Sequence, residues 1–373
     1  MKATITEIIF DFVLYIYMLF LSYKGVTLNK SIQRSYYIIV CSILLFCLFA
    51  FNGGDYFHYM EQYPDLKRGD AGGTEPIYIW IAQNVGTTYF LFRLVIWGSA
   101  LFALLSTYKL IGIRKNVCIY CFIAISLLSF SYARVSLSMA LMFCGFTILS
   151  VPHKKHKYIS AILGFFLILS SYFFHKSALF GIAVIITTLM IGKISRTKIA
   201  LILILFPVFI GIVFYLITQL FGFVNDTDME LLISERTLQT YIPDETEESG
   251  KGIAQQLLNI LNKVPIYLTF LLYLKVVFNG LIIRVPEIGQ RFMTAFFLIV
   301  IGATIFYFNP GGLHTYTLFY RFLNFSIIPI SIVLTYFYIN NIERKNVRTI
   351  LKIGIFSSFI TLLYSGYCAA LGV

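Results

Sequence analysis

Five cationic side chains stand within or beside apolar segments of the sequence, where a charge is costly. An arginine in hydrocarbon costs at least about 2.5–3.5 kcal/mol on insertion scales, so it usually binds a partner or carries out a task. Each of the five falls at the end of its segment that we predict to face away from the cytoplasm. They are Arg93, Arg134, His175, Lys176 and Arg321. We therefore expect one shared cationic site, although each side chain could instead anchor its own helix among the lipid headgroups.

The segment after the second apolar run supplies opposite charge. Asp55 follows two glycines, and Glu75 precedes a proline at the expected start of an interfacial helix. A carboxylate or a histidine can accept the proton of an attacking hydroxyl, so we predict Asp55 as the general base, with His175 and Glu75 as alternatives. Tyr56 and Tyr59 offer flat faces for stacking on sugar rings, or they pack in the aromatic belt at the membrane surface.

Arginines beside one or two acids at a membrane surface suit a lipid-linked pyrophosphate. The planar guanidinium binds phosphate oxygens bidentately, and cations stabilise a departing pyrophosphate electrostatically. The sequence has no nucleotide-binding loop and no sizeable cytoplasmic domain, and His58 and His314 form no metal-ligand spacing. We therefore expect no metal and no cofactor. The pattern disfavours ATP-driven or nucleotide-sugar chemistry inside the cell.

The composition indicates that these residues are carried by a membrane protein. Of the 373 residues, 59% are apolar and 12% are charged, whereas a soluble domain carries about 25% charged residues. The net charge of +12 does not indicate a nucleic-acid binder. Such proteins gather basic residues in one stripe or arm, but here the basic residues come in threes and fours between apolar runs. The fold expected is all-α, because helices satisfy their own backbone in lipid.

Apolar runs predict about twelve transmembrane helices in a single domain that covers residues 1–373. Two larger outer loops are expected near 52–87 and 221–262, with irregular, solvated backbone and a surface helix at 254–264. The predicted helices cover 5–23, 35–51, 88–110, 117–131, 132–151, 158–174, 176–192, 199–219, 263–280, 291–308, 321–340 and 352–370.

The basic residues between these helices predict the orientation. With the N-terminus outside, most lysines and arginines, Arg196 and Lys275 among them, fall in the cytoplasmic connections, as the positive-inside rule requires. Glu287 and Glu343 are the only ones of the 17 acidic residues on that side. The five cationic side chains and the candidate bases then lie on the outer side.

Several short motifs, in this order and on this topology, resemble the Wzy-type polysaccharide polymerases, and more closely their EpsG-like branch. The resemblance extends from about residue 50 to about residue 330. Its elements are Gly53, Asp55 and Tyr59 in a G-x-D-x-x-x-Y pattern, the pair Glu75-Pro76, Arg134 ahead of Ser138 and Ala140, the phrase F-H-K-S-A from Phe174 to Ala178, and Arg321.

The resemblance implies a glycosyltransferase of the membrane-embedded GT-C type in the bacterial inner membrane, with its active site facing the periplasm. It would transfer a growing chain en bloc from undecaprenyl pyrophosphate onto a new lipid-linked repeat unit, building O-antigen or capsule. Arg134 and Arg321 would hold the pyrophosphate, with Arg93 or Lys176 assisting, and Asp55 would act as base or orient the acceptor. Expected partners are the undecaprenyl-pyrophosphate-linked oligosaccharide, membrane lipids and a chain-length regulator protein, with no nucleic acid.

Three other functions stay open on the sequence. An O-antigen ligase or another GT-C glycosyltransferase would use the same lipid carrier. A lipid-linked oligosaccharide flippase or transporter would need charged residues along a path through the middle of the bilayer. An intramembrane acyltransferase would need a reactive site that faces the cytoplasm, where the sequence places only topological lysines and arginines.

Overall fold

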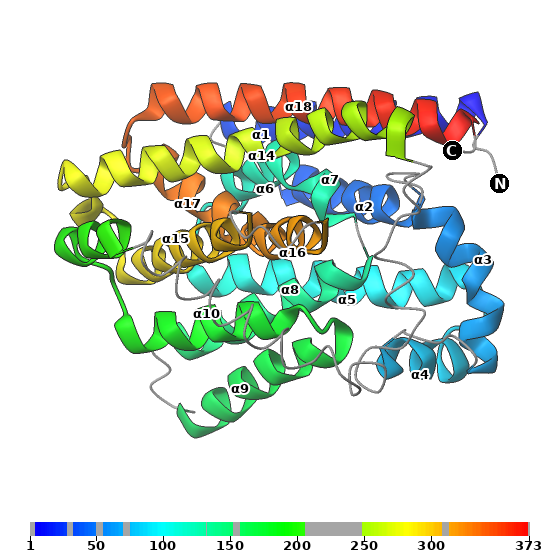
Figure 1. Ribbon diagram of the computed structural model, residues 1–373, viewed down its shortest axis with the longest axis horizontal. Coiled ribbons are helices and arrows are strands. Elements are labelled where there is room, and N and C mark those ends of the chain that lie inside the picture. Colours follow the sequence, from blue (N-terminus) through cyan, green and yellow to red (C-terminus); the bar gives the residue numbers. More distant parts are fainter. Residues whose placement is uncertain are drawn as a thin grey trace.

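The computed structural model describes residues 4–27, 33–49, 55–69, 75–131, 133–151, 157–205, 248–307 and 313–371. Within these ranges every regular element is a helix, which confirms the all-α prediction. The long helices run side by side as a bundle, and α1 (Ile5–Thr27) begins at the same end of it at which α18 (Arg344–Leu371) ends (Figure 1). That end also holds α3 (Asp55–Arg68) and α4 (Pro76–Asn84), and we call it the α3–α4 end.

Several helices are apolar and long enough to cross a membrane. Among the described residues five qualify by length and composition, namely Ile5–Thr27, Tyr89–Ile111, Ile260–Phe278, Glu287–Ile305 and Arg344–Cys368. Six shorter apolar helices accompany them, at Ser35–Phe49, Lys115–Ile125, Val135–Ser150, Tyr158–Phe174, Ala178–Ile191 and Ile327–Ile339. The chain is therefore a multi-pass membrane protein. The count of about twelve spans stays a prediction, and most of the expected helix at 199–219 lies outside the described residues.

The outward face of α9 (Lys157–Phe174) shows how the bundle meets lipid. Tyr158, Ile162, Phe166 and Phe173 are between 60% and 84% exposed, and their spacing places them on one face of the helix. A stripe of this kind is unfavourable in water but suits the hydrocarbon of a bilayer.

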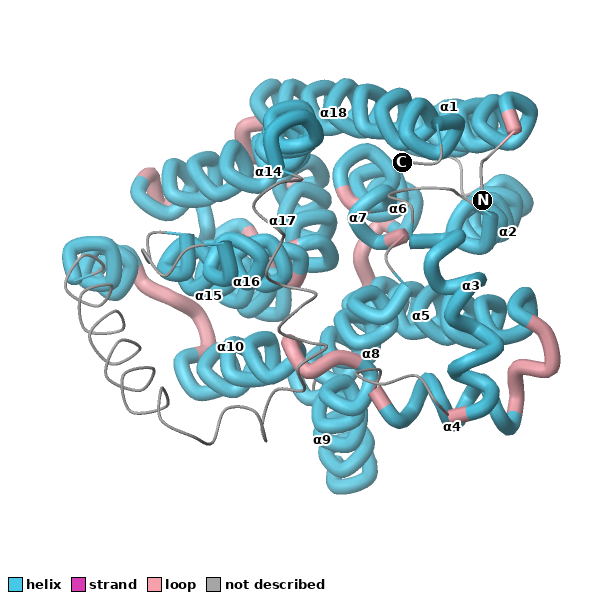
Figure 2. The backbone as a smooth tube through the Cα atoms, turned by 45° about the vertical axis from the view of Figure 1, so that its right-hand side comes forward, coloured by secondary structure: helices cyan, strands magenta, loops and turns pink. Residues whose placement is uncertain are grey.

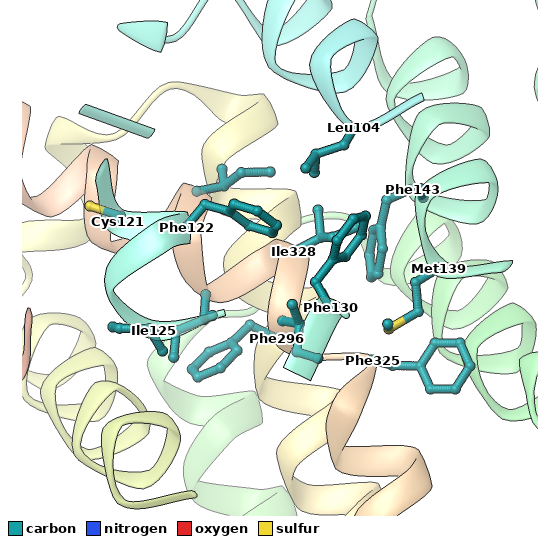
Figure 3. Close-up of a cluster of buried hydrophobic side chains, with 14 of the residues drawn as sticks. Leu104, Cys121, Phe122, Ile125, Phe130, Met139, Phe143, Phe296, Phe325 and Ile328 are labelled. Atoms are coloured by element: carbon teal, nitrogen blue, oxygen red, sulfur yellow. The ribbon is translucent and has the colours of Figure 1, made fainter. Parts of the chain in front are cut away.

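The interior is packed with aromatic and branched side chains from helices distant in sequence. Figure 3 shows Phe122 of α6 (Lys115–Ile125), Phe130 of α7 (Leu127–Phe130), Phe143 of α8 (Ala133–Ser150), Phe296 of α15 (Glu287–Tyr307) and Ile328 of α17 (Ile327–Ile339) converging on one cluster. All five are fully buried. Because lipid is as apolar as these side chains, close van der Waals packing holds the helices together.

Two glycines allow helices α8 and α9 to approach each other closely. A Cβ added to Gly145 would lie 2.5 Å from the Gly164 carbonyl oxygen, so a side chain there would force the helices apart. Further along, the Ser138 hydroxyl donates to the Ser171 carbonyl at 2.9 Å. These contacts run antiparallel, and they bring the start of α8 beside the end of α9. Figure 2 shows α8 between α9 and α5 (Tyr89–Ile111).

The irregular backbone expected near 52–87 is wrong for α3, whereas α4 begins directly after Glu75, where an interfacial helix is predicted. Buried contacts explain the helix at α3. Tyr63 and Leu66 are buried, and the Tyr63 hydroxyl donates to the Gly86 carbonyl just before α5. Burial also raises the pKa of the Tyr63 phenol above its ordinary value, so the hydroxyl stays a proton donor.

The single helix predicted at 321–340 is broken in the structure. The chain forms α16 (Leu313–Asn324), then a short break, then α17. Pro329 explains the break, because a proline ring clashes with the carbonyl four residues earlier in a continuous helix, and that carbonyl belongs to Phe325. The amides of Phe325 and Ser326 instead donate to carbonyls three residues back.

A second break lies opposite the first. The segment predicted as one helix at 117–131 forms α6 and α7, which meet at Ser126. The Ser126 hydroxyl donates to the carbonyl of Ile327, the first residue of α17, at 2.9 Å. The two interrupted helices are thus joined at their breaks, inside the bundle.

Residues predicted as two separate elements form one helix in α14 (Glu248–Phe278, 31 residues). The surface helix expected at 254–264 and the span expected at 263–280 are continuous. Pro265 lies within α14, and transmembrane helices tolerate proline when neighbours satisfy the freed backbone groups. Helix α10 (Ala178–Ile191) and the 3-10 turn η2 (Leu281–Arg284) complete the elements used below.

Candidate functional site

Arg93 is buried in the second turn of α5, and its side chain is 6% exposed. Its Nε donates to the Leu48 carbonyl at 3.1 Å, its Nη2 to the Cys47 carbonyl at 2.6 Å and its Nη1 to the Tyr89 hydroxyl at 3.2 Å. Both carbonyls belong to the last turn of α2 (Gln33–Phe49), where carbonyls lack donors within their own helix. The guanidinium therefore caps α2, and the negative end of the helix dipole favours its charge.

This cap holds the end of α2, from which the chain continues to Asp55. Asp55, Tyr56 and Tyr59 all lie in the first two turns of α3, and Asp55 and Tyr59 stand one turn apart on the helix. The other end of α3 is attached to the chain just before α5, since Lys67 Nζ donates to the Thr87 carbonyl at 3.1 Å. The segment that carries the predicted base and the predicted sugar-stacking residues is thus held at the α3–α4 end. The side chains of the three residues lie outside what the structure describes, and their roles stay predictions.

Glu75 is buried at the N-cap position of α4, and its carbonyl accepts the Tyr78 amide at 3.0 Å. Tyr78 in turn packs edge-on against Phe174, with 5.9 Å between the ring centroids. Phe174 is the last residue of α9, directly before His175. The structure therefore brings the segments of Glu75 and His175 together, although the two residues are distant in sequence.

His175 lies in the turn between α9 and α10, where its ring is fixed by Ser177. Nδ1 accepts the Ser177 backbone amide at 3.1 Å and lies 2.7 Å from the Ser177 hydroxyl. Because the amide can only donate, Nδ1 carries no proton in this arrangement, and a neutral ring then has its proton on Nε2. In this state Nε2 donates a hydrogen bond, which suits contact with an anion better than proton abstraction.

Arg134 lies in the first turn of α8, and its side chain is outside the described set. The position of its backbone follows from the Ser138–Ser171 hydrogen bond. One turn before Ser138 is Arg134, and one turn after Ser171 is His175. Because α8 and α9 run antiparallel, the two positions fall at the same level of the bundle.

Arg321 lies in the last turn of α16, rather than opening a helix as predicted. Its neighbour Phe322 stacks on Phe180 of α10, with centroids 4.3 Å apart and an interplanar angle of 17°. Phe180 stands one turn after the exposed Lys176. The end of α16 is therefore connected to the turn that holds His175 and Lys176, and Figure 2 shows α16 beside α10.

One buried cation has no role in the sequence-based prediction. Lys263 lies at the middle of α14 and is 8% exposed. Its Nζ donates to Asn324 Oδ1 at 2.7 Å and lies 5.6 Å from the centroid of the Tyr320 ring. The sequence placed Lys263 at the first residue of a span, where a lysine is an ordinary anchor. Its burial and its contact with α16 join residues distant in sequence, which spacing along the chain does not show.

The residues predicted to bind the ligand are basic. In the part of the chain that the structure describes, no group of three or more His, Cys, Asp or Glu side chains could hold a metal ion. Contacts between α8 and α9 and between α10 and α16 connect the segments of Arg134, His175, Lys176 and Arg321. Their roles in holding a pyrophosphate stay predictions, as does the assisting role of Arg93.

Comparison with known proteins identifies the family of this chain. Searches of curated proteins and of solved structures found no match. A family model described as the EpsG family matches residues 34–371. This match covers nearly the whole chain and confirms the EpsG-like resemblance predicted from the motifs. The chain is therefore a member of the EpsG family.

Proposed function

We propose that this protein is a polysaccharide polymerase that joins undecaprenyl-pyrophosphate-linked oligosaccharide repeat units into O-antigen or capsule polysaccharide. The observation that carries the proposal is the EpsG family match over residues 34–371, which suggests a membrane polysaccharide polymerase-like role. The apolar helices support it, because a lipid-linked substrate is reached within the membrane plane. The proposed location is the bacterial inner membrane, with a GT-C-like active site that faces the periplasm.

In the proposed reaction a hydroxyl of the acceptor repeat unit attacks the anomeric carbon of the lipid-linked chain. The new glycosidic C–O bond forms as the C–O bond to the pyrophosphate breaks, and the hydroxyl proton passes to the Asp55 carboxylate. Arg134 and Arg321 bind the departing undecaprenyl pyrophosphate, because paired guanidinium groups match its oxygens and offset its developing charge. Lys176 assists, whereas Arg93, whose guanidinium caps the end of α2, contributes by holding the fold.

The remaining candidates take the following roles in the proposed reaction. His175 donates from Nε2 to a pyrophosphate oxygen, since Ser177 occupies Nδ1. Glu75, buried beside the end of α9, is the alternative base. Tyr56 and Tyr59 stack on sugar rings of the acceptor. A chain-length regulator protein is the proposed protein partner.

A deletion strain tests the proposal. We expect lipopolysaccharide with single repeat units in place of a ladder on a gel, and normal ladders would contradict a polymerase. A ligase mutant would instead accumulate lipid-linked polymer that never reaches lipid A, so the same gel separates the two enzymes. Extension of a synthetic lipid-linked repeat by the purified protein gives the direct measurement.

A flippase is the second candidate, and the burial of Lys263 is the observation in its favour. A transporter needs charged residues along a path through the membrane, and Lys263 is buried in the first turn of the apolar segment Ile260–Phe278 of α14. Reconstitution decides between the two functions, because a flippase moves the lipid-linked repeat across a vesicle membrane without lengthening its glycan.

A further inference from the structure

The ammonium group of Lys263 has neutral partners. Asn324 Oδ1 accepts one hydrogen bond at 2.7 Å, and the Tyr320 ring lies below the charge at 5.6 Å. Within the described ranges, Lys263 forms no ion pair. Burying an ammonium without a counter-charge costs several kcal/mol, and an amide oxygen and a ring offset only part of that cost.

Lys275 on the same helix shows the ordinary arrangement. It lies about 18 Å further along α14, at 1.5 Å per residue. Its side chain is half exposed, and its Nζ pairs with Glu343 Oε1 at 2.8 Å. Lys275 thus has a carboxylate partner, whereas Lys263 has none among the described residues. A buried ionisable group inside a membrane protein is by default a candidate binding site.

The surroundings of Lys263 are held rigidly, as a binding site requires. The adjacent Asn262 accepts hydrogen bonds from Ser357 and Thr361 of α18, both at 2.8 Å. Asn324 is the last residue of α16, directly before the break that Pro329 imposes. The lysine is therefore positioned from α14, α16 and α18 at once.

The chemistry of the cluster points to an anion with more than one charge. An ammonium has three donors, and Asn324 takes one, so two stay available for oxygens of a ligand. Arg321 stands one turn before Asn324 on α16. Two cations on neighbouring helices suit a diphosphate better than a single carboxylate, because each phosphate carries its own charge.

We propose that Lys263 binds the diphosphate of the lipid-linked substrate together with Arg321, and that Asn324 positions the Lys263 ammonium. This inference rests on the proposed function, since it takes the ligand to be the leaving group of that reaction. It adds a binding residue from α14, a helix from which the sequence predicted none.

Binding of a short prenyl diphosphate tests the inference without any need for turnover. We would titrate full-length protein in detergent with farnesyl diphosphate and with farnesyl monophosphate by calorimetry. A charge-assisted hydrogen bond contributes enough that Lys263→Met should weaken diphosphate binding about 10- to 100-fold. Lys263→Arg should recover part of the affinity, and the monophosphate should respond less. Lys275→Met is the matched control and should bind as the wild type does.

The outcomes separate this inference from the proposed function. Unchanged diphosphate affinity in Lys263→Met, or no binding by the wild type, overturns the inference even if the protein extends lipid-linked repeats. Lys263-dependent binding in a protein that extends nothing supports a diphosphate site and contradicts the polymerase. If Lys263→Met does not fold, Lys263→Gln and Asn324→Ala replace it, with a weaker loss expected from Asn324→Ala because the charge is kept.

Discussion

Arg93 and Lys263 are two buried cations in the same protein, and their hydrogen-bond partners differ. The Arg93 guanidinium donates to two carbonyls at the end of α2 and to a tyrosine hydroxyl, so it completes the hydrogen bonding of a helix. The Lys263 ammonium donates to one side-chain amide and rests on one ring. Burial alone therefore does not indicate function. The partners of a buried charge show whether it supports the fold or is available to a ligand.

The largest effect is expected at Arg321, beside the Lys263 cluster. Arg321→Ala should lower the polymerisation rate at least about 100-fold, as the loss of an electrostatic donor does in other enzymes, with an unchanged amount of protein in the membrane. Arg321→Lys should also fail, because a point charge does not reproduce the planar fork. Chain extension by purified protein measures the effect.

Arg284 provides the control for Arg321. It is exposed in η2, next to the last turn of α14, and Arg284→Ala should extend chains normally. Full activity in Arg321→Ala and in Arg134→Ala would contradict the proposal that these arginines bind the pyrophosphate.

Arg93→Met should affect stability first, in contrast to Lys263→Met. It leaves the Cys47 and Leu48 carbonyls without their donor, and hydrogen bonds to a charged group contribute about 1.5–3 kcal/mol each. We expect a clear fall in the melting temperature of the purified protein, measured by the exposure of buried cysteines on heating. Arg68→Met, at an exposed ion pair with Asp65, should melt as the wild type does. Equal melting of Arg93→Met and wild type would remove the distinction between the two cations.

Gly145→Ala tests whether the site also depends on helix spacing. The added Cβ would lie 2.5 Å from the Gly164 carbonyl oxygen, and overpacking of this kind typically costs about 1–3 kcal/mol. Because α8 and α9 position Arg134 and His175, activity should fall together with thermal stability. Gly98→Ala on α5 is the matched control, since a Cβ there meets nothing within 4 Å. A Gly145→Ala protein as stable and active as Gly98→Ala would contradict the close approach.

The smallest effect is expected at Lys275, whose ion pair with Glu343 is partly solvated. Exposed pairs contribute about 0–1 kcal/mol, and Lys275→Met should change the melting temperature by a degree or two at most. A loss as large as that of Arg93→Met would show that this pair, although half exposed, holds the end of α14 to the start of α18.

The sequence predicted the membrane class, the all-α fold and the EpsG-like family, because hydropathy and short motifs carry these properties directly. It also placed Lys275, Glu343 and Arg196 on one side. In the structure Lys275 pairs with Glu343, and the Arg196 guanidinium lies against Gly280 close by. Basic clusters between apolar runs thus predicted which connections share one end of the bundle.

Other features depend on contacts that periodicity does not show. The carbonyl partners of Arg93 lie 45 and 46 residues earlier in the chain, so spacing could not identify a helix cap. Lys263 stands at the start of the predicted span and in the first turn of the apolar segment Ile260–Phe278, so its place along the chain gave no sign that neighbouring helices bury it. Pro329 did carry a local signal for the break between α16 and α17, and a stricter reading of proline would have found it.

The hydrogen bond between Ser126 and Ile327 connects two interrupted helices at their breaks, and we call this contact the joint. On one side of the joint, α7 leads directly into the helix of Arg134. On the other side, α16 carries Arg321. We expect a tilt of either half-helix to be transmitted through this joint, so that it changes the positions of both arginines together.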